Sequence, residues 1–126
     1  AAAANANLDI MENESLFDRA AETGVYLQEK LRTEFENHPH VGEVRGLGML
    51  GAIDVVKDKE TREVFDPSRK LPLRIYRRLI TKGVIARAAG VSGIAVCPPY
   101  IIERNEIDQV VGAIRETLDE IMDEEG

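Results

Sequence analysis

The residue of this chain with the clearest chemical potential is Arg87, within the stretch GVIARAAGVSGIAVCPPYIIERNEI at residues 83–107. It ends a short apolar run, Val84–Arg87, in which the strand pattern does not require a charge. One interpretation is an arginine at a strand edge that reaches solvent. The other is an anion receptor, because a guanidinium presents a planar fork of donors that matches a carboxylate, and a strand end aims it rigidly.

A second motif lacks the structural context that its function requires. Residues 46–51, GLGMLG, have the letters of a dinucleotide-binding GxGxxG sequence. That motif requires a helix to open at its third glycine, so that the helix N-terminus meets the pyrophosphate. Here Gly51 leads into the apolar run 52–56, which favours a strand. We therefore expect a hairpin turn and no nucleotide site.

The histidines and the single cysteine are not predicted to do chemistry. His38 and His40 flank Pro39 and lack the further ligands of a metal site, so both are expected at the surface. Cys97 precedes Pro98 in an apolar strand, and no histidine is placed to activate its thiol. A small buried side chain is predicted there.

Composition places the chain among ordinary globular proteins. With 126 residues, 44% hydrophobic and 31% charged, it is expected to form one domain over 1–126. A net charge of −7 argues against a nucleic-acid partner, and no apolar run approaches the ~20 residues that span a bilayer. The arginines of residues 74–78 and the acidic residues after 118 are both expected to be solvated.

The sequence also gives expectations about the cellular compartment and about the chain ends. One cysteine cannot form an internal disulfide, and the alanine-rich N-terminus lacks the basic and long apolar regions of a signal peptide. We expect a cytoplasmic protein. The chain begins without Met in an uncapped helical tract, which predicts a fragment of a longer protein.

The elements that must position Arg87 follow from hydrophobic periodicity. Helices are expected over residues 1–12, 14–37, 71–82 and 104–123, and a frayed tail over 123–126. Strands are expected over Val41–Arg45, Met49–Val56, Val84–Arg87 and Ile94–Cys97, with a charged loop at 57–69. The order ααββαββα predicts an α+β fold, in which a small antiparallel sheet of about four strands is covered on one face by helices.

The stretch around Arg87 resembles the C-terminal part of class III (ω-)aminotransferases, pyridoxal-phosphate enzymes of fold type I. In that family a strand ending in R-a-x-G is followed by P-P-[LY]-[IV]-[IV] and a helix with E-[IV]-D. The matching residues are Arg87, Gly90, Pro98, Pro99, Tyr100, Ile101, Ile102, Glu106, Ile107 and Asp108. The likeness extends over almost the whole chain, including Arg45 in the family stretch x-R-G-x-G-[LM]. A structural anchor near the domain junction is expected there, with a substrate-facing role as the alternative.

The resemblance implies the C-terminal small domain of a larger aminotransferase, with residues 1–12 as the end of the helix that links it to the missing large domain. Such an enzyme transfers an amino group from an amine or ω-amino acid to a keto acid such as pyruvate, using pyridoxal 5'-phosphate (PLP). In the family the Schiff-base lysine and most PLP ligands belong to the large domain. No catalytic, cofactor-binding or metal-binding residue is therefore expected here, and the fragment is expected to be inactive alone.

The resemblance also assigns a role to Arg87. It matches the family arginine that pairs with the substrate carboxylate and swings aside for other substrates, so this domain is expected to recognise the carboxylate and to close the active site. Family members are usually homodimers. Two alternatives stay open: a stand-alone dimerisation or interaction module without catalysis, and another PLP activity on the same fold, such as an aminomutase or decarboxylase.

Overall fold

The structure is a computed structural model that describes residues 1–125, and its elements follow the predicted order with one 3-10 helix added. The helices are α1 (Ala2–Asn13), α2 (Leu16–Phe35), α3 (Leu71–Thr81) and α4 (Arg104–Glu125), and the 3-10 helix η1 spans Pro67–Arg69. The strands are β1 (Val41–Leu47), β2 (Leu50–Val55), β3 (Arg87–Ala89) and β4 (Gly93–Val96). The predicted α+β fold is confirmed.

The strands form one antiparallel sheet in the order β1-β2-β4-β3, so β1 and β3 are its edges. Side chains alternate between the two faces of a sheet. On one face Val44, Ile53, Ile94 and Ala88 lie in a row across the four strands, and Ile53 and Ile94 are only 2% and 1% exposed. This is the core face.

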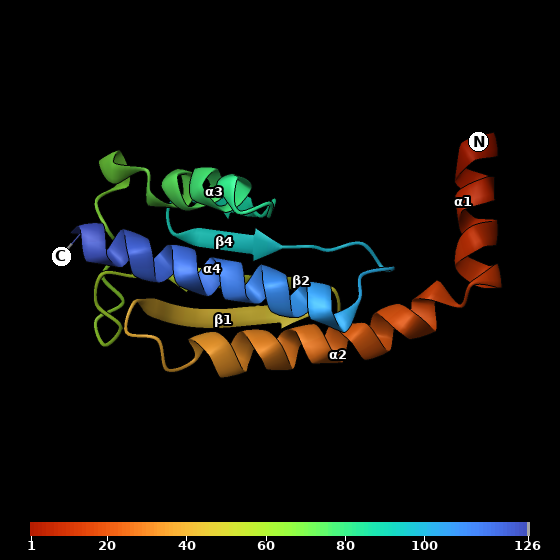
Figure 1. The fold of residues 1–126 in the computed structure, drawn as a ribbon, viewed down its shortest axis with the longest axis horizontal. Coiled ribbons are helices and arrows are strands. Elements are labelled where there is room, and N and C mark those ends of the chain that lie inside the picture. The colour runs from red at the N-terminus through yellow and green to blue at the C-terminus, as the bar shows by residue number, and fades with distance from the viewer. Residues whose placement is uncertain (126) are drawn as a thin grey trace.

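Helices cover the core face and leave the other face open. α2 packs on β1 and β2, α3 packs on β3 and β4, and α4 packs against both helices (Figure 1). Each large apolar side chain buried in this way stabilises the fold by about 1.5–3 kcal/mol. The largest fully buried side chains are Phe35, Leu27, Leu31, Ile53, Ile75, Leu79, Ile94, Ile107, Ile114, Leu118 and Ile121.

The β1–β2 hairpin is tied closely to α2. Gly48 adopts a positive φ of 55° in the two-residue turn between the strands, which confirms the glycine-dependent turn predicted for GLGMLG. The side-chain amide of Gln28 donates to the carbonyls of Gly48 and Leu50 at 2.8 and 3.0 Å. A Cβ on Gly24 would lie 2.7 Å from the Gly48 backbone, so the helix approaches the turn as closely as a glycine allows.

The β3 strand is displaced from its prediction. The run 84–87 keeps the alternation of a strand, since Val84 and Ala86 are buried and Ile85 is 84% exposed. Pairing nevertheless begins only at Arg87, which faces Ala95. Continuing that register would set Val84 opposite Pro98, which has no backbone N–H to donate. Arg87 therefore begins β3 instead of ending a longer strand.

His38 is buried, so the surface position predicted for it is wrong. It is 3% exposed, and its Nε2 lies 2.9 Å from Asp119 Oδ1 on α4. Its Nδ1 accepts the backbone N–H of His40 at 3.0 Å, which places the proton of the neutral ring on Nε2. Burial disfavours the imidazolium and lowers the pKa of His38, although the bond to Asp119 opposes that shift.

The basic and acidic groups predicted to be solvated stay partly exposed and also pair across α3 and α4. Arg78 contacts Glu120 at 3.2 Å and Glu124 at 2.7 Å, and Arg74 contacts Glu124 at 3.0 Å. Lys82 reaches Glu120 at 2.8 Å. These contacts accompany the extension of α4 past the predicted end at residue 123, while Gly126 lies outside the described residues.

α1 stands apart from the rest of the fold. Figure 1 shows it turned away at the start of α2, and none of its residues is buried. Leu8 and Ile10 are 52% and 50% exposed. Its alanines favour a helix without tertiary contacts. No helix within residues 1–125 is both long and apolar enough to cross a membrane.

Candidate functional site

Arg87 lies on the open face of the sheet, at the first residue of β3. Arg87 pairs with Ala95, Ala95 with Ala52, and Ala52 with Arg45, so the four residues form one row across the sheet. We call this the arginine row. Arg87 is exposed. The two alanines between Arg87 and Arg45 project only a methyl group from the sheet.

A cavity of about 570 Å3 surrounds Arg87. Its lining is otherwise apolar or backbone, and consists of Leu50, Ile85, Ala86, Ala88, Ala89, Gly90, Ala95 and Cys97. Arg87 is the only charged residue in that lining. Within residues 1–125 no carboxylate pairs with it, and it donates no hydrogen bond. The site is therefore one uncompensated guanidinium in an apolar surround.

The position of Arg87 depends on two glycines at the β3–β4 turn. Gly90 has a positive φ of 60° and reverses the chain. A Cβ on Gly93 would lie 2.7 Å from the carbonyl oxygen of Ala89, so β3 can approach β4 only because Gly93 has no side chain. The register that places Arg87 beside Ala95 rests on this close approach.

This arrangement suits the binding of a carboxylate. A guanidinium offers two parallel N–H donors to the two carboxylate oxygens, and no other charged side chain in the lining competes for them. A hydrogen bond to a charged group contributes ~1.5–3 kcal/mol. The exposed aliphatic side chains of Leu50 and Ile85 can contact an apolar part of the same ligand. Among the described residues that line this cavity, Arg87 is a binding group, and the exposed Cys97 thiol has no histidine or carboxylate in the same lining to activate it.

Arg45, at the other end of the arginine row, is neutralised. Its guanidinium forms a bidentate pair with Asp54, one bond of which measures 3.3 Å, and lies 3.5 Å from Glu43. The hydrogen bond that Arg45 donates to Asp54 raises the pKa of Arg45, and partial desolvation opposes that effect. The structural role predicted for Arg45 matches these contacts.

Cys97 departs from its prediction, because it is exposed and lines the cavity around Arg87. Continuing the β2–β4 register by one pair and the β3–β4 register by two pairs sets it between Leu50 and Ile85. The three side chains therefore form an apolar row next to the arginine row. Sequence reasoning missed Leu50 and Ile85 as site residues. Their alternation with Ala52 and Arg87 signals a shared face, but it does not tell which face the helices leave open.

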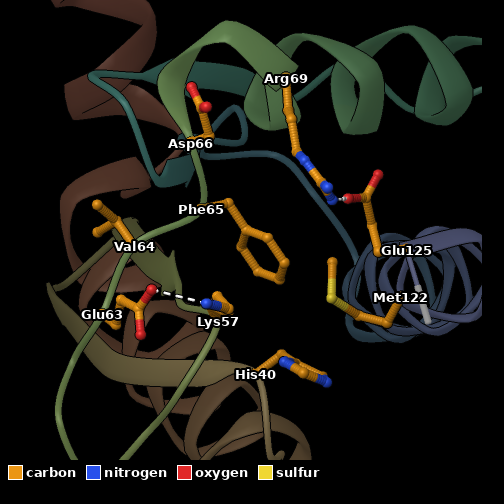
Figure 2. Close-up of a pocket in the computed structure, with 9 residues that line it drawn as sticks. All are labelled: His40, Lys57, Glu63, Val64, Phe65, Asp66, Arg69, Met122 and Glu125. Atoms are coloured by element: carbon orange, nitrogen blue, oxygen red, sulfur yellow. Dashed lines mark hydrogen bonds and ion pairs between the residues drawn. The ribbon is translucent and has the colours of Figure 1, made fainter.

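A second cavity, of about 490 Å3, lies at the opposite end of the strands. Figure 2 shows Phe65 pointing into it, between His40 and Met122. Its charged groups are already engaged: Lys57 pairs with Glu63 at 2.7 Å, and Arg69 pairs with Glu125. No comparable free charge marks this cavity as a binding site. Within residues 1–125 no group of three or more His, Cys, Asp or Glu side chains could hold a metal ion.

Comparison with known proteins places the chain in a family. The family described as Aminotransferase class-III matches residues 1–118. The chain is 40% identical over 123 residues to the diaminobutyrate–2-oxoglutarate transaminase of Halomonas elongata, covering 97% of this chain and 26% of that protein. It is 36% identical over 121 residues to the putrescine–pyruvate aminotransferase of Pseudomonas aeruginosa, covering 95% of this chain and 26% of that protein.

Solved structures agree with the sequence matches. A transaminase from work on directed evolution by ancestral reconstruction superposes with a TM-score of 0.94 at 44% identity, covering 98% of this chain and 27% of that chain. The chain thus spans about a quarter of the length of the proteins it matches.

The residues present do not fit a PLP site, although the family implies that cofactor. A Schiff base requires a free lysine. Lys30, Lys57 and Lys82 pair with carboxylates, Lys59 donates to backbone carbonyls, and Lys70 lies exposed at the N-cap of α3. None of the lysines lines the cavity around Arg87. No step of PLP chemistry is therefore derived from these residues.

Proposed function

The chain belongs to the class III aminotransferase family, and we propose that it acts as part of a PLP-dependent transaminase. That enzyme transfers an amino group from an amine or ω-amino acid to a keto acid such as pyruvate. The two relatives named above use 2-oxoglutarate and pyruvate by name, so a keto acid is common to both. We place the enzyme in the cytoplasm as a homodimer, in keeping with the single cysteine and with the family resemblance.

Within this enzyme the chain is the C-terminal small domain, and it recognises the substrate carboxylate and closes the active site. The Schiff-base lysine and the main PLP ligands lie in the other three quarters of the polypeptide. α1 links the two parts. Its exposed Leu8 and Ile10, and the open face with Leu47 and Leu50 at 87% and 56% exposure, support an arrangement in which further protein covers them.

One observation carries the assignment of carboxylate recognition to Arg87. It is a guanidinium without a carboxylate partner among residues 1–125, in an apolar cavity, at the position that resembles the family's carboxylate-binding arginine. An unpaired charge beside apolar side chains gains more from a ligand carboxylate than a charge already paired within the protein.

Two other functions are distinguished by further observations. A stand-alone dimerisation or interaction module predicts a native polypeptide near 14.0 kDa, whereas the transaminase predicts one several times larger. An aminomutase or decarboxylase would keep the same small domain, and product identification with an amine and pyruvate separates it from a transaminase.

The test of Arg87 compares two half-reactions of the full-length enzyme. Arg87→Ala should lower kcat/KM for pyruvate roughly ten- to a hundredfold, and should leave turnover of an amine donor without a carboxylate nearly unchanged. Arg77→Ala is the matched control, because Arg77 is another exposed arginine, on α3 and outside this cavity. Equal losses in both half-reactions would refute the role in recognition.

A further inference from the structure

The two arginines of the arginine row differ in how their charge is balanced. Arg45 and Arg87 stand at its ends, three strand spacings apart, or ~14 Å between their Cα atoms. Only Ala52 and Ala95 lie between them, so no bulky side chain separates the two guanidinium groups. A ligand that lies across the open face would contact both guanidinium groups.

Arg45 is withheld from such a ligand by two carboxylates on its own hairpin. Asp54 holds it in a bidentate pair, and Glu43 lies 3.5 Å from it. The Asp54 side chain is 24% exposed and the Arg45 side chain 48%, so the pair sits at the surface of the open face. Arg87 has no counterpart to either carboxylate within residues 1–125.

We propose that Asp54, assisted by Glu43, is a specificity-determining residue that favours a monocarboxylic over a dicarboxylic keto acid by keeping Arg45 paired. This inference rests on the proposed function, in which Arg87 binds the carboxylate of the acceptor. It also explains why a second carboxylate on the acceptor would gain no binding energy from the open face of the sheet.

Two physical effects act in the same direction. A second carboxylate could pair with Arg45 only by displacing Asp54, which exchanges one ion pair for another without net gain. It would also approach Asp54 and Glu43, and like charges brought together are repelled. Discrimination of this kind, by an element that disfavours the wrong ligand, is a common source of specificity.

Asp54 is well placed to hold this pair because of its neighbour on β4. It faces Gly93, and a Cβ at that position would lie 3.3 Å from Asp54 Oδ1. The absence of a side chain at Gly93 thus leaves room for the carboxylate beside Arg45. The same glycine admits β3 to the sheet, so one residue serves the placement of both arginines.

The test measures kcat/KM of the full-length enzyme for 2-oxoglutarate and for pyruvate with one amine donor. Asp54→Asn removes the charge but keeps the shape, and leaves Arg45 with only the weaker contact to Glu43 at 3.5 Å. The ratio of 2-oxoglutarate to pyruvate should rise about two- to fivefold, the range expected for a partly exposed ion pair. Glu43→Gln should shift the ratio less and in the same direction, and gives the answer if Asp54→Asn fails to fold.

A double variant and a control identify the cause. In Asp54→Asn/Arg45→Gln most of the gain should be lost, because pairing with Arg45 is its main source and only the relief of charge repulsion remains. Glu63→Gln breaks an exposed ion pair at the other end of the sheet and should leave both acceptors unaffected.

The outcomes distinguish a failure of this inference from a failure of the proposed function. If Arg87→Ala impairs pyruvate use while neither Asp54→Asn nor Glu43→Gln changes the ratio, this inference is overturned and the proposed function stands. A ratio that is raised to the same extent in the double variant as in Asp54→Asn also overturns it, because Arg45 is then not involved. If Arg87→Ala leaves pyruvate use intact, the proposed function itself is wrong.

Discussion

The backbone N–H of His40 donates to Nδ1 of His38 at 3.0 Å, and this bond exists only while the buried ring is neutral. The other ring nitrogen faces Asp119, which is itself held by Arg115 at 2.9 Å. A proton added to Nδ1 would break the bond to His40 and place a charge in a site that is 3% exposed. The contact between the segment after α2 and helix α4 therefore depends on a neutral His38 ring.

The stability of the chain should therefore fall as the pH drops below about 6.5, the ordinary pKa of histidine. The pKa of His38 is lowered in the folded state, so between the folded and unfolded values only the unfolded chain binds the proton. The slope is at most about 1.4 kcal/mol per pH unit for one group. Urea unfolding of the 126-residue chain between pH 5 and 8 measures it.

The matched variants are His38→Gln and His40→Gln. The first should be less stable at pH 7.5 and should lose most of the pH dependence, whereas the second should keep it. A slope between pH 5 and 7 that survives His38→Gln would show that another group is responsible.

Substitution of a helical glycine by alanine should have opposite effects on stability at Gly24 and at Gly112. Gly24→Ala should destabilise the chain, because the added Cβ would lie 2.7 Å from the Gly48 backbone and push the hairpin off α2, weakening both hydrogen bonds of Gln28. Gly112→Ala on α4 meets nothing within 4 Å and should stabilise the chain by ~0.5–1 kcal/mol, the gain in helix propensity. Thermal unfolding of both variants checks the signs. A stabilised Gly24→Ala chain would contradict the close approach.

Thr117 presents a buried hydroxyl without a partner. Its side chain is 0% exposed, and its Oγ1 finds no hydrogen bond among residues 1–125. Thr117→Val keeps the shape and removes the unsatisfied group, so we expect a gain of about 1 kcal/mol in the free energy of unfolding. Thr117→Ser, which keeps the hydroxyl and loses the methyl group, should be less stable than wild type. A loss of stability in Thr117→Val would mean that the hydroxyl has a partner after all.

The geometry of the Arg87 donors can be tested apart from their charge. Arg87→Lys keeps the positive charge but loses the planar fork that pairs with two carboxylate oxygens. In the full-length enzyme we expect kcat/KM for pyruvate to fall about three- to tenfold, less than in Arg87→Ala. The loss should lie mainly in KM. A lysine variant as active as wild type would argue against bidentate recognition.

Much of the architecture was predictable because it depends on local patterns. The 3.6-residue spacing of apolar side chains gives α2, α3 and α4, and Gly46-Leu47-Gly48 predicts the β1–β2 turn. The charge of Arg87 within an apolar run is likewise visible without a fold, and its role in carboxylate recognition stays a prediction. Such signals are carried by neighbouring residues, so the sequence displays them directly.

What the sequence alone could not decide depends on register and on which surfaces the helices cover. Nothing local distinguishes Cys97, which is exposed just after β4, from Val96, the last residue of β4, which is buried. The burial of His38 requires α4, some 80 residues further along the chain, to supply Asp119. In the same way only the pairing of four strands brings Leu50 beside Arg87 and leaves Arg45 bound to Asp54. Sequence determined which residues carry charge, and long-range pairing decided which charge stays free.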